Sequence, residues 1–160
     1  MNDALFVSPT NESPDKSSGV VLLAEDNDDE LLLFKRAFKR AEIKNPLQIV
    51  RDGEQAMAYL KGEGEFADRQ KYPFPTLVLL DLKLPRADGF QVLRWVRSQS
   101  AIKTVRIVML SNSEDANVIK LAHELGANSF ISKSPDMTEF VAQLRSVKRY
   151  WLDLSRAPGI

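Results

Sequence analysis

Five short, mainly apolar runs, separated by segments of helical spacing, constrain the fold of this chain more than any other feature. The runs lie at residues 20–24, 47–50, 76–80, 106–110 and 129–132. Between them, apolar residues recur every three or four positions, which predicts helices at 28–40, 54–61, 90–96, 116–125 and from 137 onward. Strands that are apolar along their whole length are typical of a parallel sheet with helices on both faces. The alternation therefore predicts an α/β fold with a doubly wound parallel sheet.

The length of 160 residues favours one domain, which we expect to span residues 20–154. Residues 1–19 are rich in Ser, Pro, Asn and Asp, and this composition predicts a flexible N-terminal tail. Residues 155–160 are expected to form a short C-terminal tail, and residues 62–75 a polar loop.

Composition excludes several classes of function. The 22 Lys and Arg residues balance the 22 Asp and Glu residues, so there is no bulk attraction to nucleic acid or to an anionic membrane. The absence of cysteine excludes disulfides and a thiol nucleophile, and the single histidine, His123, excludes a multi-histidine metal site. No apolar run approaches the ~20 residues of a membrane span, and no secretory signal is visible. We expect a cytoplasmic protein without nucleic-acid or membrane partners.

Acidic, hydroxyl or ammonium side chains follow four of the five predicted strands directly. Glu25 and Asp26 come after the first run, Asp81 after the third, Ser111 after the fourth and Lys133 after the fifth. In open parallel sheets, ligands bind beyond the carboxyl ends of the strands. We therefore expect three acids, one hydroxyl and one ammonium group to converge on one edge of the sheet.

Clustered acids limit what this edge can do. Two carboxylates ~4 Å apart repel each other by about 4 kcal/mol at an effective dielectric constant of ~20, so the cluster must bind protons or a cation. A set of oxygen ligands suits Mg²⁺, and the metal together with Lys133 would attract phosphoryl oxygens. Asp81 could then act as a nucleophile. Taken singly, each residue could instead be a solvated strand end, and "EDNDDE" an acidic helix start capped by Asn27 or Asp28.

Four stretches resemble, in order and spacing, the receiver domain of response regulators: "LLAEDNDD", "LLDLKLPRADG", "IVMLSNS" and "GANSFISKSPD". The resemblance spans about residues 20–154 and implies a flavodoxin-like (βα)5 fold with strand order 2-1-3-4-5. It implies a single-domain response regulator of a two-component or phosphorelay system. Such a protein accepts a phosphoryl group from a partner histidine kinase in a Mg²⁺-dependent reaction and signals by conformational change. It is no enzyme beyond promoting its own phosphorylation and dephosphorylation.

By position, the resemblance makes Asp81 the phosphoacceptor. Glu25 and Asp26 become the acidic pair that holds Mg²⁺ together with Asp81, and the backbone carbonyl of Lys83 completes the protein ligands.

The same resemblance assigns the residues that respond to phosphate. Ser111 becomes the switch hydroxyl, Phe130 the aromatic switch residue, and Lys133 the partner of the phosphate.

A narrower resemblance concerns the partner. The loop "GEGEFADRQKYPFP", the turn "LPRADG" and the tail "KRYWLDL" are similar to the small stand-alone regulators of bacterial phytochrome histidine kinases. No output domain follows, so a downstream phosphotransfer protein is a second expected partner.

Two departures from the family pattern concern the site. The family usually has Lys-Pro after the fifth strand, with a cis peptide that places the lysine, whereas this chain has Lys133, Ser134 and Pro135. Either a costly cis bond precedes Ser134 or the loop takes another path. Asn112 stands where a small residue is usual.

The last helix carries an apolar stripe that extends beyond the expected domain. Phe140, Leu144 and Val147 should pack on the sheet, whereas Trp151 and Leu154 should stay exposed. Exposed apolar area predicts an interface, here a homodimer through Trp151 and Leu154.

Two alternatives stay open. A Mg²⁺-dependent phosphatase with an aspartyl nucleophile usually has a second Asp two residues on, where this chain has Lys83. A pseudo-receiver, a binding module that never carries phosphate, is disfavoured by the complete acids and by Lys133, but the altered loop keeps it open.

Overall fold

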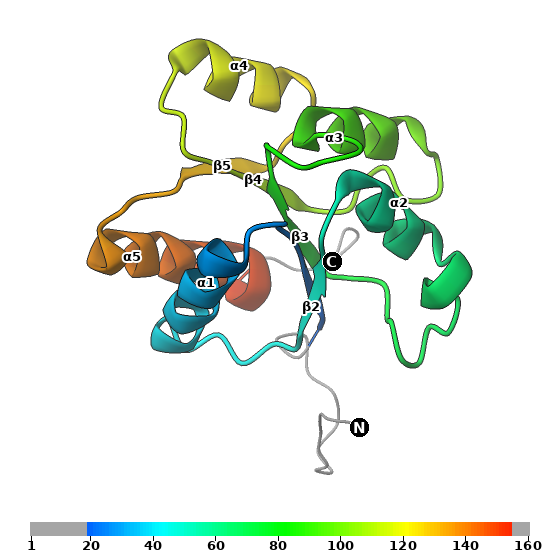
Figure 1. The fold of residues 1–160 in the computed structure, drawn as a ribbon, viewed down its shortest axis with the longest axis horizontal. Coiled ribbons are helices and arrows are strands. Elements are labelled where there is room, and N and C mark those ends of the chain that lie inside the picture. The colour runs from blue at the N-terminus through cyan, green and yellow to red at the C-terminus, as the bar shows by residue number, and fades with distance from the viewer. Residues whose placement is uncertain (1–18, 155–160) are drawn as a thin grey trace.

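A five-stranded parallel sheet forms the centre of the molecule (Figure 1). The computed structural model describes residues 19–154. The strands, whose order in the sheet is β2-β1-β3-β4-β5, are β1 (Val21–Ala24), β2 (Leu47–Val50), β3 (Leu77–Asp81), β4 (Ile107–Ser111) and β5 (Ser129–Ser132). The expected fold class and strand order are therefore confirmed.

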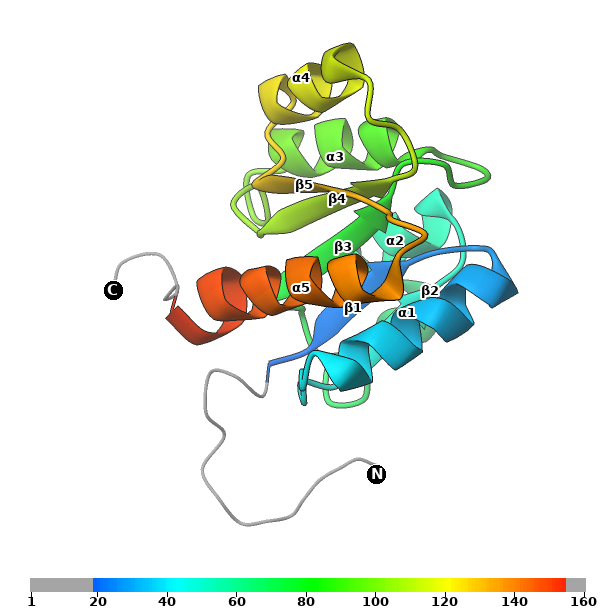
Figure 2. The ribbon, with the colours of Figure 1, turned by 90° about the vertical axis from the view of Figure 1, so that its left-hand side faces the viewer.

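Helices cover both faces of the sheet (Figures 1 and 2). They are α1 (Asp28–Arg40), α2 (Gly53–Lys61), α3 (Gly89–Ser98), α4 (Ala116–Glu124) and α5 (Met137–Val147). Helices α1 and α5 pack against one face, and α2, α3 and α4 lie on the other. Successive residues of β1 serve the two faces in turn: Val21 and Leu23 face α1 and α5, and Leu22 and Ala24 face the opposite core. This double burial is why β1, β3 and β4 are almost entirely apolar, whereas the edge strands β2 and β5 also carry polar residues.

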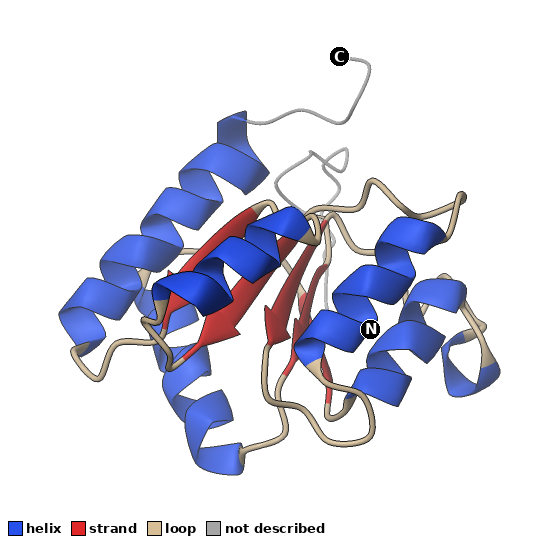
Figure 3. Cartoon of the chain, turned by 90° about the horizontal axis from the view of Figure 1, so that it is seen from above, coloured by secondary structure: helices blue, strands red, loops and turns tan. Residues whose placement is uncertain are grey.

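The strands all run in the same direction, so their carboxyl ends meet at one edge of the sheet (Figure 3). Two strands extend one residue further than predicted and end on Asp81 and Ser111. The ladder explains the extension, because Leu82 N–H donates to the Leu110 carbonyl at 2.9 Å and Lys133 N–H to the Ser111 carbonyl at 2.6 Å. Asp81 and Ser111 are thus held as part of the sheet rather than on a loop.

The loop predicted at 62–75 is only partly irregular. A short 3₁₀ helix, η2 (Gly64–Phe66), buries Phe66. Arg69 fastens the remainder, since its guanidinium donates to the carbonyls of Tyr59, Leu60 and Tyr72 at 2.8–3.1 Å. The polar composition concealed this packing.

The end of the chain departs from the predicted stripe. After α5 the helix changes to a π-helix, η3 (Lys148–Leu154), in which each residue advances less around the axis. Leu152, only 4% exposed, therefore enters the core. Trp151 is half-buried, and its indole N–H donates to Ser129 Oγ at 3.2 Å.

The expectation that Trp151 is left exposed is therefore wrong. The homodimer predicted from it loses this support and stays a prediction, and the Leu154 side chain lies outside the described part of the structure. The predicted tails, apart from Gly19, also lie outside the described residues. Among residues 19–154, no helix has the length and apolar character to cross a membrane.

Replacing Leu152 by alanine should lower the free energy of unfolding by about 2–5 kcal/mol, because a buried leucine side chain is removed. Replacing its neighbour Tyr150, which is 60% exposed, should cost less than about 1 kcal/mol. Urea denaturation of both variants measures the difference. Equal losses would contradict the π-helical path of the chain.

Candidate functional site

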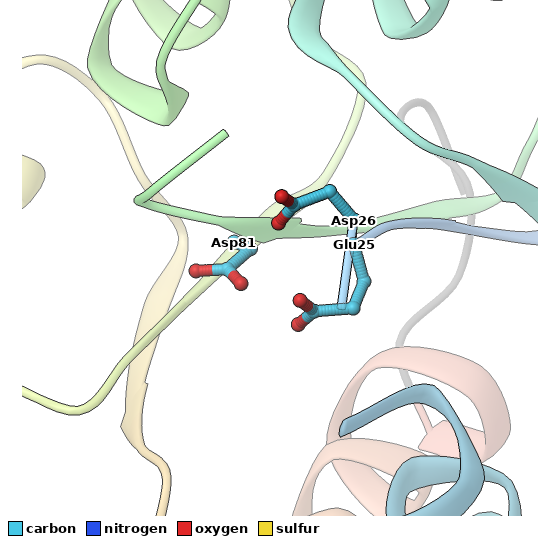
Figure 4. A group of neighbouring side chains, drawn as sticks. All are labelled: Glu25, Asp26 and Asp81. Carbon is cyan, nitrogen blue, oxygen red and sulfur yellow. The ribbon is translucent and has the colours of Figure 1, made fainter. Parts of the chain in front are cut away.

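Three carboxylates meet at the carboxyl edge of the sheet (Figure 4). Glu25 and Asp26 follow β1 directly, and Asp81 is the last residue of the neighbouring strand β3. One oxygen atom from each carboxylate lies within 4.8 Å of the other two. Parallel pairing of β1 with β3 produces this closeness, because it brings the two strand ends into register.

Burial divides the three acids. Glu25 and Asp81 are 3% and 5% exposed, whereas Asp26 is exposed to solvent. Removal from water raises the pKa of Glu25 to about 7, and the hydrogen bond and negative charge of Asp81 act in the same direction against the opposing effect of Lys133. Glu25 therefore holds a proton more tightly than an ordinary glutamate when no cation is bound.

The ammonium group of Lys133 lies among three carboxylates. Its Nζ donates to Asp81 Oδ2 at 2.8 Å, to Glu25 Oε1 at 2.9 Å and to Glu30 Oε1. Burial alone would lower the pKa of this lysine, but the hydrogen bonds and charges of the carboxylates outweigh burial and raise the pKa. Lys133 therefore stays charged and offsets part of the negative charge of the cluster.

Backbone N–H groups fix the orientation of the two buried acids. Lys83 N–H donates to Asp81 Oδ1 at 3.1 Å, and Asn27 N–H donates to Glu25 Oε2 at 3.2 Å. Both oxygens of Asp81 and both oxygens of Glu25 thus accept a hydrogen bond. These carboxylates are held in one arrangement before any ligand arrives.

Glu30 belongs to this site, although sequence reasoning missed it. It lies in the first turn of α1, where its own N–H donates to Oδ1 of the N-cap residue Asn27 at 2.9 Å. An acid in the first turn already has a reason to be there, because it complements the helix dipole. The sequence therefore offered no reason to look for a second role, and only the fold shows that the Glu30 side chain contacts Lys133.

Ser111 and Phe130 lie on the adjoining strands. Ser111 is buried, and its Oγ accepts a hydrogen bond from Ser113 N–H at 3.0 Å. Phe130 is half-buried on β5 beside Met109 of β4 and packs against the core under α2, α3 and α4. Ser111 therefore lies on the strand next to Asp81, and Phe130 on the edge strand beyond it.

The altered loop after β5 does not prevent Lys133 from reaching the acids. The described residues contain no cis peptide bond, so the bond between Lys133 and Ser134 is trans. Asn112, the second departure, is exposed beyond the end of β4.

The donor set fits a hard divalent cation. Three carboxylates supply only oxygen ligands and leave further positions for water, which is the coordination that Mg²⁺ prefers. The edge thus combines an acid cluster that could hold a cation with a hydrogen-bonded carboxylate and a hydrogen-bonded ammonium group.

Known proteins are similar to this chain in sequence. Residues 21–145 match the family described as the response regulator receiver domain. The chain is 32% identical to the response regulator Rcp1 of Synechocystis sp. over 140 residues, which cover 88% of this chain and 93% of Rcp1.

Solved structures agree with the sequence match. The response regulator RPA3017 in red light signaling of R. palustris has a TM-score of 0.84 and 37% identity, covering 89% of this chain and 99% of that chain. The phosphorylated cyanobacterial phytochrome response regulator RcpA has a TM-score of 0.78 and 33% identity, covering 88% and 99%. The Mn(2+)-bound form of Rcp1 has a TM-score of 0.76 and 31% identity, with the same coverage. The chain belongs to the response regulator receiver domain family.

Proposed function

We propose that the protein is a single-domain response regulator that accepts a phosphoryl group on Asp81 from a phosphohistidine of a partner kinase, in a Mg²⁺-dependent reaction. One observation carries the proposal: a buried carboxylate at the end of a strand lies between an acidic pair and a lysine ammonium. The phosphorylated RcpA and the Mn(2+)-bound Rcp1 among the similar structures support it.

Glu25, Asp26 and Asp81 would hold Mg²⁺, and the carbonyl of Lys83, whose N–H already contacts Asp81, would be a further ligand. The bound cation would offset negative charge on the phosphoryl oxygens as they approach the acids. The proton on Glu25 would leave when the cation binds.

In the transfer step, a carboxylate oxygen of Asp81 attacks phosphorus. A P–O bond forms while the P–N bond of the phosphohistidine breaks, and the histidine nitrogen keeps the electron pair of that bond. Lys133, whose Nζ lies 2.8 Å from Asp81 Oδ2 in the structure, would donate an N–H to an equatorial phosphoryl oxygen. The strand and the Lys83 N–H hold Asp81 in place, so little order has to be gained during the step.

Ser111 and Phe130 would transmit the signal. Ser111 Oγ would exchange its contact with Ser113 for a phosphoryl oxygen, and Phe130 would turn inward beside it. Both changes would shift the population between two packings of the same fold. The surface formed by α4, β5 and α5 would carry the change to a partner.

The relatives support a histidine kinase as the partner. RcpA is described as a phytochrome response regulator and RPA3017 acts in red light signaling, so we propose a bacterial phytochrome as the kinase. A downstream phosphotransfer protein, a homodimer and a cytoplasmic location complete the proposal.

Acetyl phosphate with Mg²⁺ should add one phosphoryl group to the protein, and Asp81→Asn should abolish the addition because the nucleophilic oxygen is lost. Asp29→Asn, an exposed acid outside the cluster, should leave it unchanged. Intact-protein mass spectrometry measures the product. Turnover of phosphate monoesters would favour the phosphatase, and an unmodified native protein would favour the pseudo-receiver.

Mg²⁺ should bind more tightly as the pH rises through 7, because the cation competes with the proton on Glu25. Below about pH 7 the dissociation constant should rise about tenfold per pH unit, as expected for one displaced proton, and above about pH 8 it should level off. Isothermal titration calorimetry measures it. Glu25→Gln should bind more weakly without this slope, whereas a constant affinity between about pH 6 and about pH 8 in the native protein would refute the competition.

A further inference from the structure

Three carboxylates contact Lys133 in the described part of the chain, and Glu30 is the one that has no role in the proposed chemistry. A lysine ammonium has three N–H donors, and here they meet one oxygen each from Glu25, Asp81 and Glu30. These oxygens come from the end of β1, the end of β3 and the first turn of α1. Only the first two belong to the acid cluster that could hold a metal ion.

We propose that Glu30 is a positioning residue that holds the Lys133 ammonium beside Asp81 when the other two carboxylates are needed elsewhere. The inference rests on the proposed function, in which Glu25 turns to the cation and Asp81 to the phosphoryl group. Both would then loosen their contacts with Lys133, whereas Glu30 lies outside the acid cluster and keeps its contact.

Hydrogen bonds at the start of α1 hold the backbone of Glu30 in place. Its N–H donates to Asn27 Oδ1 at 2.9 Å, and the next residue, Leu31, donates its N–H to the Asn27 carbonyl at 2.9 Å. The Asn27 N–H in turn donates to Glu25 Oε2, so the start of α1 is tied to the acid pair. A side chain on a capped helical turn holds its partner more closely than one on a free loop.

Lys133 needs such a partner because its stem is long. A lysine side chain has four rotatable bonds, and ordering it opposes every contact that it makes. A charge-assisted hydrogen bond that the ammonium donates to the Glu30 carboxylate keeps it in reach of the reacting oxygens. Loss of this contact should slow the transfer without removing the nucleophile or the metal ligands.

An opposite effect of Glu30 is conceivable on charge alone, since its carboxylate would repel an incoming phosphoryl group. Two variants separate the effects. Glu30→Gln keeps an oxygen acceptor and the shape of the side chain but removes the charge, and Glu30→Ala removes both. Repulsion would make both variants faster than the native protein, whereas positioning makes Glu30→Ala the slowest of the three.

The test measures phosphorylation by acetyl phosphate at saturating Mg²⁺ in the full chain. We expect Glu30→Ala to react about tenfold more slowly and Glu30→Gln to recover most of the rate. Asp29→Ala, an exposed acid on the same helical turn, should react at the native rate and serves as the matched control. A Glu30→Ala rate equal to or above the native rate overturns the inference.

A second measurement needs no phosphoryl donor. NMR relaxation of the Lys133 ε-methylene in the Mg²⁺-bound protein should show higher mobility in Glu30→Ala than in Asp29→Ala, and unchanged mobility overturns the inference. If the native protein takes up no phosphoryl group, the proposed function fails and the inference with it. If the native protein is phosphorylated and Glu30→Ala is not slower, the inference alone fails.

Discussion

The repulsion between Glu25, Asp26 and Asp81, offset by a single ammonium group, is the interaction on which the site depends. Burial makes the repulsion costly, and it leaves Glu25 with a pKa of about 7. Lys133 relieves part of the cost because it donates to both buried acids. A divalent cation would offset the remaining repulsion. Without a cation, one edge of the sheet carries negative charge that Lys133 balances only in part.

The parallel sheet holds the backbone of these charged residues in place. Asp81 is fixed because it is the last residue of a central strand that is buried on both faces. Lys133 starts from a backbone that is bonded to Ser111, one strand away from Asp81 in the sheet. A free loop could carry a charged group away from its neighbours, whereas the ladder fixes the backbone from which the Asp81 and Lys133 side chains extend. The fold thus supplies the preorganisation that phosphoryl chemistry requires.

The sequence patterns predicted the features that depend on the backbone alone, namely the strands and the common edge at which they end. Runs such as Val21–Ala24 are apolar because both faces are buried, and the residue after each run falls at the same edge by topology. Side-chain partners were harder to foresee. Glu30 already had a helix-start explanation, and the 3.6-residue period that places Phe140 and Leu144 gave no sign that Leu152 would be reached through a π-helix. These contacts depend on local tertiary packing, which the spacing of residues along the chain does not reveal.

A crystal structure of the protein with Mg²⁺ and beryllofluoride tests the central claim most directly. The account predicts beryllofluoride on a carboxylate oxygen of Asp81, Mg²⁺ between the acids, and the Lys133 ammonium on a fluorine atom. A metal ion bound away from Glu25, Asp26 and Asp81, or a Lys133 side chain turned out to solvent, would contradict it.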